Sequence, residues 1–293
     1  MKKILALLIT VILSLGILTA CGKSAPDAAL GLGTAVSYSD GEAAEAAVSA
    51  TVVTVAAVIL EDGRIRSIAV TSFSDGYAVS DRGVYSDREV TEYAYSTDGL
   101  VGRSESEIRG IAMDENLRKA ILSAIADAKS EGAAGCTGTD QVGIAIMGKG
   151  SGTNADFYIE DGMNGKASTD ATYAAVALDA SGKVSAAALD AIQISRTFGA
   201  SGTLTEPKPT LTKRELGYDY GMKGVSASYG IGLEWFEQAS GFCTYLLGKT
   251  KDEIGSIGIS NQGKPTDAAL LSYCTIAIGD FVAVARAAAE DAT

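Results

Sequence analysis

Two stretches of the chain nearly repeat one another, and this repetition constrains the fold more than any other feature of the sequence. LVGRSESEIRGIAM begins at Leu100, and LLGKTKDEIGSIGI begins at Leu246. Each stretch carries a hydroxyl residue followed three positions later by a glutamate, which is the spacing of a helix capping box. A motif that is written twice indicates that one supersecondary unit occurs twice in the chain.

The repeated stretches belong to longer parallel segments. VAAVILEDGRI in the first half resembles YAAVALDASGKV in the second. Equivalent positions lie 118 residues apart at Ala56 and Ala174, and 146 residues apart at Leu100 and Leu246. A conserved order with a growing offset is typical of a tandem duplication in which the second copy has received insertions.

Each copy is predicted to contain a β-hairpin. VVTVAAVIL and RIRSIAVTSF flank the turn dipeptide Asp62-Gly63, whose glycine accepts a positive φ. ATYAAVAL and KVSAAAL flank a second turn at 179–182. Because the alternation of apolar and polar residues is imperfect, we expect helices to cover one face of each sheet. The alanine-rich stretches NLRKAILSAIADA and DFVAVARAAAEDA are predicted to be closing helices, the second preceded by a strand in CTIAIG.

These elements predict an α+β protein with two tandem related domains, each an antiparallel β-hairpin or sheet packed with helices. The first copy is placed at 31–132 and the second at 141–293, with a glycine-containing linker at 133–140. The first copy is trimmed, because it has no counterpart of the helical segment around Trp235.

The first residues predict export from the cytoplasm. Two lysines precede an uncharged apolar run, which is typical of a signal peptide at 1–20 and not of a membrane span. LTAC places small residues directly before Cys21 and resembles the lipobox of bacterial lipoproteins. This resemblance implies that Cys21 is acylated and holds the protein on the extracytoplasmic face of the cell membrane through a polar tether at 21–30.

The overall charge restricts the partners. Removal of Lys2 and Lys3 with the signal peptide lowers the formal net charge from −12 to −14. A protein with this negative charge repels nucleic acid and anionic lipid headgroups. We therefore expect that it has no nucleic-acid partner and that only the lipid on Cys21 attaches it to the membrane. The sequence leaves the oligomeric state open.

The residue types also restrict the chemistry. The chain has no histidine, which excludes Ser-His-Asp and Cys-His catalysis. No pair of carboxylates has a spacing typical of general acid–base work, so no catalytic residue is assigned and enzymatic activity would need a cofactor. Cys136, Cys243 and Cys274 match no zinc pattern, and we expect them to be buried small residues.

The second half carries a resemblance to a known group of proteins. KRELGYDYGMKG, GLEWFEQASGF and GKPTDAALLSYCTIAIGDF resemble mostly uncharacterised surface lipoproteins of Gram-positive, clostridial-type anaerobes. That group is distantly similar to FMN-binding domains of extracellular electron-transfer proteins. The wider family has a late Asp…Ser-Gly-Ala-Thr motif, whose threonine receives the phosphate of FMN from a flavin transferase.

The resemblance places this motif at Asp267, Ser272 and Thr275. Tyr273 stands where the family has glycine and would crowd the approach of a transferase, so the resemblance leaves covalent and non-covalent FMN open. Tyr273 and Trp235 could offer aromatic surface to an isoalloxazine ring. Trp235 equally suits a core position on a helical stripe, and Thr275 equally suits a β-branched strand residue.

A second alignment pairs Arg88-Glu89 in DREVTEYAY with Arg214-Glu215 in KRELGYDY. Each pair has two interpretations. The arginine could bind a phosphate while the glutamate holds it in place, or both could be solvated charges at the start of a helix.

The sequence thus leads to two functional hypotheses. The first is a membrane-anchored extracytoplasmic lipoprotein with duplicated FMN-binding-like domains, a flavin-associated electron carrier served by a flavin transferase or a redox partner. The alternative is a non-catalytic surface lipoprotein that acts as a binding or interaction module.

Replacement of Cys21 by serine is expected to abolish anchoring, because a hydroxyl cannot take the thioether-linked lipid. Cell fractionation followed by mass spectrometry of the intact protein checks this expectation. The variant should be released, or should keep its signal peptide. A fully processed Cys21→Ser protein in the membrane fraction would contradict the lipoprotein prediction.

Overall fold

The computed structural model describes residues 28–43, 46–156, 162, 164–208 and 210–293. Cys21, the predicted signal peptide and most of the predicted tether lie outside these residues. None of the described helices has the length and apolar character that a membrane crossing requires.

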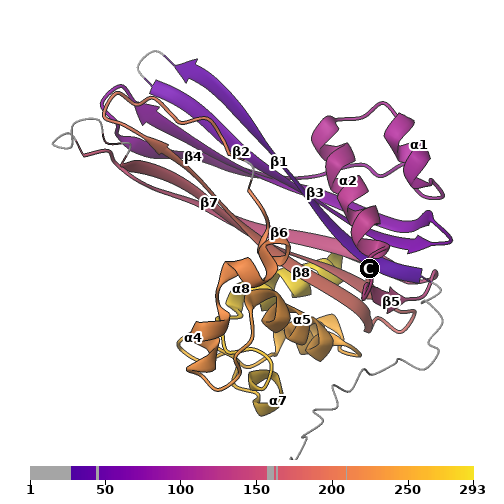
Figure 1. Ribbon diagram of the computed structural model, residues 1–293. Helices are drawn as coiled ribbons and strands as arrows, with labels where there is room; N and C mark the ends of the chain where they lie inside the picture. Colours follow the sequence, from indigo (N-terminus) through magenta and orange to yellow (C-terminus); the bar gives the residue numbers. More distant parts are fainter. Residues whose placement is uncertain (1–27, 44–45, 157–161, 163, 209) are drawn as a thin grey trace, which may run out of the picture.

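Within these residues, eight strands form two antiparallel sheets (Figure 1). The first sheet has the order β4-β3-β2-β1-β5 and contains β1 (Ala28–Ala43), β2 (Ala46–Glu61), β3 (Arg64–Ser80), β4 (Tyr85–Ala94) and β5 (Ala134–Cys136). The second has the order β6-β7-β8 and contains β6 (Gln141–Thr153), β7 (Gly165–Leu178) and β8 (Val184–Phe198). Both predicted hairpins, β2–β3 and β7–β8, are therefore confirmed.

The described helices follow the strands of each half. The first half contains α1 (Glu105–Gly110) and α2 (Glu115–Ala128). The second contains α3 (Lys213–Leu216), the 3₁₀ helix η1 (Gly217–Tyr220), α4 (Lys223–Ala227), α5 (Trp235–Leu246), α6 (Lys251–Gly255), α7 (Ala268–Leu271) and α8 (Gly279–Asp291). Antiparallel sheets combined with helices agree with the predicted α+β class.

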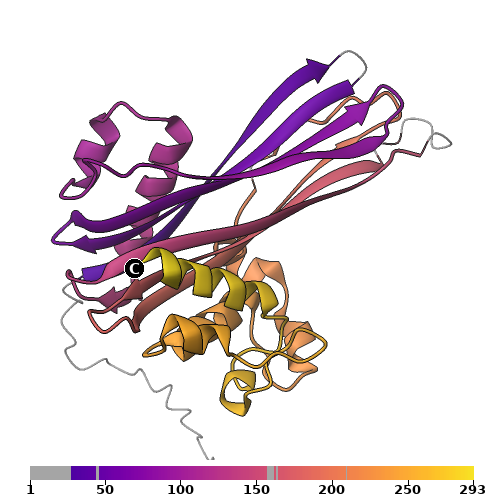
Figure 2. The ribbon, with the colours of Figure 1, turned by 180° about the vertical axis from the view of Figure 1, so that it is seen from behind.

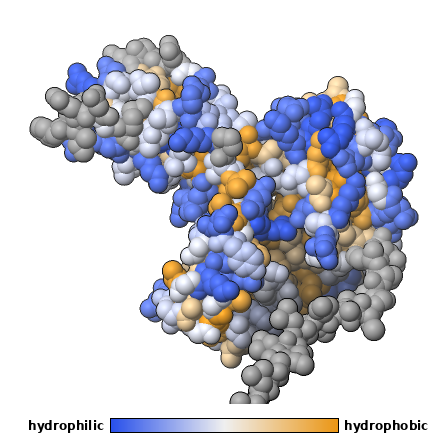
Figure 3. Space-filling model, in the orientation of Figure 1, coloured by the Kyte–Doolittle hydropathy of each residue, from blue (hydrophilic) through white to orange (hydrophobic). Residues whose placement is uncertain are grey.

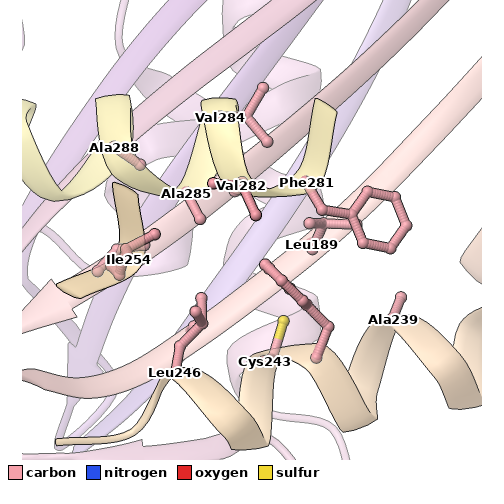
Figure 4. Packing of buried hydrophobic residues seen from close by; sticks show 14 of the residues in the cluster. Leu189, Ala239, Cys243, Leu246, Ile254, Phe281, Val282, Val284, Ala285 and Ala288 are labelled. Atoms are coloured by element: carbon pink, nitrogen blue, oxygen red, sulfur yellow. The ribbon is translucent and has the colours of Figure 1, made fainter. Parts of the chain in front are cut away.

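The elements stack in four layers, helix–sheet–sheet–helix (Figures 1 and 2). The inner faces of the two sheets share one core, in which Phe73 from the first sheet packs with Tyr173 and Ile192 from the second. On the outer faces, α2 covers the first sheet, while α5 and α8 cover the second. Figure 4 shows Val282 and Ala285 of α8 pointing toward α5, and Cys243 and Leu246 of α5 pointing toward α8. The predicted helical cover on one face of each sheet is confirmed.

The strands extend well beyond the covering helices (Figure 1), and there two polar contacts, each with at least one buried partner, join the two sheets. Arg196 of β8 is only 5% exposed and donates to Asp40 Oδ1 of β1 at 2.6 Å. Thr169 of β7 donates to Asp75 Oδ2 of β3 at 2.5 Å. Because each buried charge has a partner on the opposite sheet, these contacts fix how the sheets lie on one another.

Helix α2 touches the backbone of β1 where the chain has glycine. A Cβ atom on Gly31 would overlap the carbonyl oxygen of Ala124, and one on Gly33 would overlap the backbone of the same helical turn. At the end of the helix, Asp127 Oδ2 accepts a hydrogen bond from Leu32 N at 2.9 Å. The helix therefore covers the sheet and also satisfies an unpaired N–H of a strand.

Helix α8 makes the same kind of contact in the second half. A Cβ atom on Gly143 of β6 would overlap the carbonyl oxygen of Ala288. Asp291 Oδ2 accepts a hydrogen bond from Ile144 N at 3.0 Å. Thus glycine on the first strand of each half admits the helix, and an aspartate at the helix end accepts a hydrogen bond from the strand residue after Gly31 or Gly143.

The repeated sequence stretches occupy matching positions as well. Ser104 with Glu107 forms a capping box at α1, and Thr250 with Glu253 forms one at α6, as predicted. Before these helices, Gly102 N donates to Ile65 O of β3, and Gly248 N donates to Val184 O of β8. Each turn thereby pairs with the first residues of the second hairpin strand.

Several predicted boundaries were wrong. The tether was expected to reach residue 30, but β1 begins at Ala28, and the side chain of Leu30 is buried because it packs in the inner core between the sheets. The expected linker at 133–140 contains β5, which is antiparallel to β1. The two halves are also not packed independently, because they share the inner core, although each half has an outer core of its own beneath its helices.

Two predictions about local structure were also wrong. CTIAIG is not a strand: Thr275 N donates to Gln238 Oε1, and Ile278 N donates to Gly263 O, so loop contacts take the place of a ladder. The alignment of Arg88 with Arg214 joins unlike structures, since Arg88 lies on β4 and Arg214 on α3.

Replacement of Gly31 by alanine is expected to destabilise the fold by about 1–3 kcal/mol or more, because the new methyl group meets helix backbone that cannot rotate away. Gly41→Ala is the matched control on the same strand, since no atom lies within 4 Å of its Cβ position. Urea unfolding of both variants measures the difference. Equal midpoints for the two variants would contradict the proposed close helix–strand contact.

Candidate functional site

Three of the residues that the resemblance singles out lie around the short helix α7. Asp267 caps this helix and accepts from Ala269 N at 2.8 Å and Leu270 N at 3.2 Å. Ser272 ends the helix and donates to Ala269 O at 2.6 Å, while Tyr273 is 52% exposed. The local hydrogen bonds of Asp267 and Ser272 account for these residues as helix caps.

Thr275 lies where the segment after α7 meets α5. Its backbone N–H donates to Gln238 Oε1 at 3.0 Å, and its hydroxyl donates to the same oxygen at 3.4 Å. The residue is 8% exposed. A phosphate on this hydroxyl would break the hydrogen bond to Gln238 and would need space inside the packed chain.

Trp235 begins α5 and is 3% exposed. Its ring makes edge-to-face contacts with Phe281 at 5.7 Å and Tyr220 at 6.5 Å between centroids. Lys213 Nζ lies 5.3 Å from the Trp235 ring centre and 5.1 Å from that of Tyr220. Trp235 is thus a core residue on a helical stripe and also the wall of a cavity.

This cavity lies on the outer face of the second sheet, at the N-terminal end of α8. It consists of two adjoining hollows of about 380 Å³ and about 230 Å³, which share Thr172, Ala191, Lys213 and Asp280. We refer to both together as the outer-face cavity. It exists because the strands continue past the beginning of α8, which leaves part of the sheet uncovered (Figure 2).

The two hollows differ in their walls. Lys149, Asp170 and Gln193 are cross-strand neighbours on the floor of the larger hollow, and Gln193 Nε2 donates to Asp170 Oδ1 at 2.8 Å. Trp235 and Phe281 line the smaller hollow. The outer-face cavity therefore joins a polar floor to an aromatic end, with Lys213 shared between them.

A second cavity of about 410 Å³ lies where the two halves meet, between α2 on one side and α3 and α5 on the other. We refer to it as the junction cavity. Its walls include Leu32, Asp127, Asp190, Arg214 and Phe236. Figure 3 shows the surface hollowed between the part that carries α2 and the part that carries α5.

Asp190 is the most buried charge of the junction cavity, with 6% exposure. It accepts from Ala191 N at 2.8 Å and from Arg214 N at 3.0 Å. Burial raises the pKa of its carboxyl to about 6 despite these donors. Tyr173 is the cross-strand partner of Asp190 and accepts from Thr34 Oγ1 at 2.6 Å.

Arg214 connects the two halves through its side chain. Its two terminal nitrogens donate to the two oxygens of Asp127, at 3.3 Å and 3.0 Å. Glu215, the partner expected from the sequence, instead accepts from Thr212 N at 2.7 Å as part of a capping box. The partner of Arg214 is thus 87 positions away in the sequence.

Sequence reasoning missed Asp190 and Asp127. The only local signal for Asp190 was a single acid inside the apolar strand KVSAAALDAIQI. Such a residue must find buried donors or lose its charge. Asp127 resembled an ordinary solvated residue of an alanine-rich helix.

The three cysteines among the described residues offer no reactive thiolate. Burial raises the pKa of Cys136 and of Cys243 to about 12 and that of Cys274 to about 11. Cys243 and Cys274 are buried, as expected, whereas Cys136 is half-buried. Within the described ranges, acidic and thiol side chains form no group of three or more that could hold a metal ion.

Comparisons of the chain with protein-family models, with curated proteins and with solved structures found no match. The functional argument therefore rests on the residues and the geometry of the two cavities.

The raised pKa of Asp190 predicts how stability depends on pH. Its folded value of about 6 lies above the ordinary value of about 4, so the folded chain holds this proton more tightly than the unfolded chain. The resulting stabilisation is present below about pH 4 and is lost as the pH rises to 6. Asp190→Asn should not show this loss, so its stability relative to wild type should rise by up to about 3 kcal/mol between pH 4 and 7.

Urea unfolding at several pH values checks this expectation. Asp219→Asn, at an exposed position, is the control and should follow the wild-type curve. If the free energy of unfolding of Asp190→Asn changes with pH in the same way as that of wild type, this carboxyl does not titrate as expected.

Proposed function

We propose that this protein is a lipid-anchored extracytoplasmic protein that binds a flavin, with FMN as the first candidate, non-covalently in the outer-face cavity. The observation that carries the proposal is the convergence of Trp235, Tyr220, Phe281 and Lys213 on one cavity in the half that resembles the FMN-binding proteins. Anchoring through Cys21 rests on the LTAC motif.

The chemistry of the cavity suits a planar anion. Its larger hollow, of about 380 Å³, lies in the range of about 300–1,000 Å³ that is usual for small-molecule sites. Trp235 and Tyr220 provide apolar ring surface, while Lys149 and Lys213 provide cations for a phosphate. Neither lysine has a carboxylate within salt-bridge distance among the described residues.

The residues around Thr275 fit covalent attachment poorly. The hydroxyl is committed to Gln238 inside the chain, and Thr275 does not line either hollow. We therefore propose the non-covalent mode. A bound flavin would supply electron transfer, while Lys213 and Lys149 would hold the phosphate and the aromatic end would exclude water.

We further propose that the two halves descend from one duplicated unit and that the second half alone gained the ligand site. The glycine and aspartate contacts of α2 and α8 and the two capping-box helices support a common origin. The inserted helices α3 and α5 supply Lys213 and Trp235 to the cavity. In the first half, β4 takes the corresponding place in the chain.

Titration of the full-length mature protein with FMN tests the proposal through quenching of flavin fluorescence. We expect saturable binding, weakened at least tenfold by Lys213→Gln because the phosphate loses a cation. Trp235→Phe should weaken binding while keeping the core filled. Ser272→Ala, which changes only the end of α7, is the matched control and should bind as wild type.

Two results would overturn the proposal. Absence of binding at FMN concentrations up to about 1 mM would exclude a carrier role and would favour the non-catalytic interaction module. Equal losses in Ser272→Ala and Lys213→Gln would mean that flavin binds somewhere other than the outer-face cavity.

A further inference from the structure

The junction cavity shares no lining residue with the outer-face cavity, so it needs an explanation of its own. Its walls come from both halves: Leu32 and Ala126 from the first, Asp190, Arg214 and Phe236 from the second. A cavity of about 410 Å³ that contains a buried acid and a partly exposed arginine has the size and the polar groups of a small-molecule site.

Arg214 keeps donors that could bind a ligand. Two of its guanidinium N–H groups donate to Asp127, and the others have no acceptor among the described residues. The side chain is 36% exposed, so the guanidinium is held in place and is still reachable. An arginine that is fixed by one carboxylate on one edge can bind a second carboxylate on another.

The opposite charge lies in the same cavity. Asp127 forms an ion pair with Arg214, whereas no cationic side chain of the described ranges lies within salt-bridge distance of Asp190 or Glu215. Asp190 is held rigidly by backbone donors on β8 and α3. The cavity therefore combines free N–H donors of Arg214 with two carboxylates that form no ion pair among the described residues, which suits a ligand that carries both signs of charge.

Apolar surface completes the site. Leu32 and Ala126 line the cavity from β1 and α2, and Phe236 lines it from α5. Phe236 is held by an edge-to-face contact with Tyr218 at 5.3 Å between ring centres. This surface would cover an aliphatic group of a few carbons while the charged groups face Arg214 and Asp190.

From this arrangement we propose that the junction cavity binds a small zwitterion, an α-amino acid with an aliphatic side chain. Its carboxylate pairs with Arg214, its ammonium group with Asp190 and Glu215, and its side chain packs against Leu32 and Phe236. The proposal does not depend on flavin binding, because the two cavities have no residue in common.

Isothermal titration of the full-length mature protein with three matched probes tests the charge requirement. L-Leucine carries both charges, 3-methylbutylamine lacks only the carboxylate, and 4-methylpentanoate lacks only the ammonium group. We expect leucine to bind at least tenfold more tightly than either single-charge probe. Undetectable leucine binding, or equal affinity for leucine and for either of the other probes, would overturn the proposal.

Variants then test the location. Ser123 lines the cavity from α2, so Ser123→Leu should fill it and reduce leucine binding at least tenfold without touching an ion pair. Arg214→Lys keeps the charge and loses the planar fork, and should also weaken binding. Lys119→Leu, on the exposed face of the same helix, is the control and should bind as wild type.

The same variants separate the two sites. Ser123→Leu should leave FMN titration unchanged, and Lys213→Gln should leave leucine titration unchanged. Undiminished leucine binding by Ser123→Leu, with its fold verified by an unchanged unfolding midpoint, would place any amino-acid site elsewhere and overturn the assignment.

Discussion

The structure depends on the close contact between one helix and the first strand of each half. Helix α2 packs directly on the backbone of β1 at Gly31, and α8 packs on β6 at Gly143, at positions where any side chain would collide with the helix. So short a separation brings many apolar atoms of the alanine-rich helices into contact with the sheets. Since dispersion weakens steeply with distance, these glycines determine how well each outer core is packed.

This contact also places charges where the chain needs them. With α2 fixed on β1, Asp127 at its end reaches both the N–H of Leu32 and the guanidinium of Arg214. Asp291 at the end of α8 makes only the first type of contact, with Ile144. The second half thus supplies an arginine to the aspartate of the first, and the junction cavity forms around this pair.

The outer-face cavity follows from a difference in length. Helix α8 has 13 residues, whereas β6, β7 and β8 have 13, 14 and 15 and rise about twice as much per residue. One helix therefore cannot cover the whole sheet. The uncovered part carries Lys149, Asp170 and Gln193 in register, and aromatic rings from α5 and η1 close it at one end.

Local sequence patterns determined the two hairpins, the capping boxes of α1 and α6 and the helices that close each half. Each of these features depends on residues a few positions apart, such as Asp62-Gly63 or Thr250 with Glu253. Only the tertiary structure decided that the sheets share one core, that CTIAIG is a loop, and that Arg214 pairs with Asp127 and not with Glu215. These contacts join residues far apart in the chain, and their energy comes from burial and from partners that no local pattern specifies.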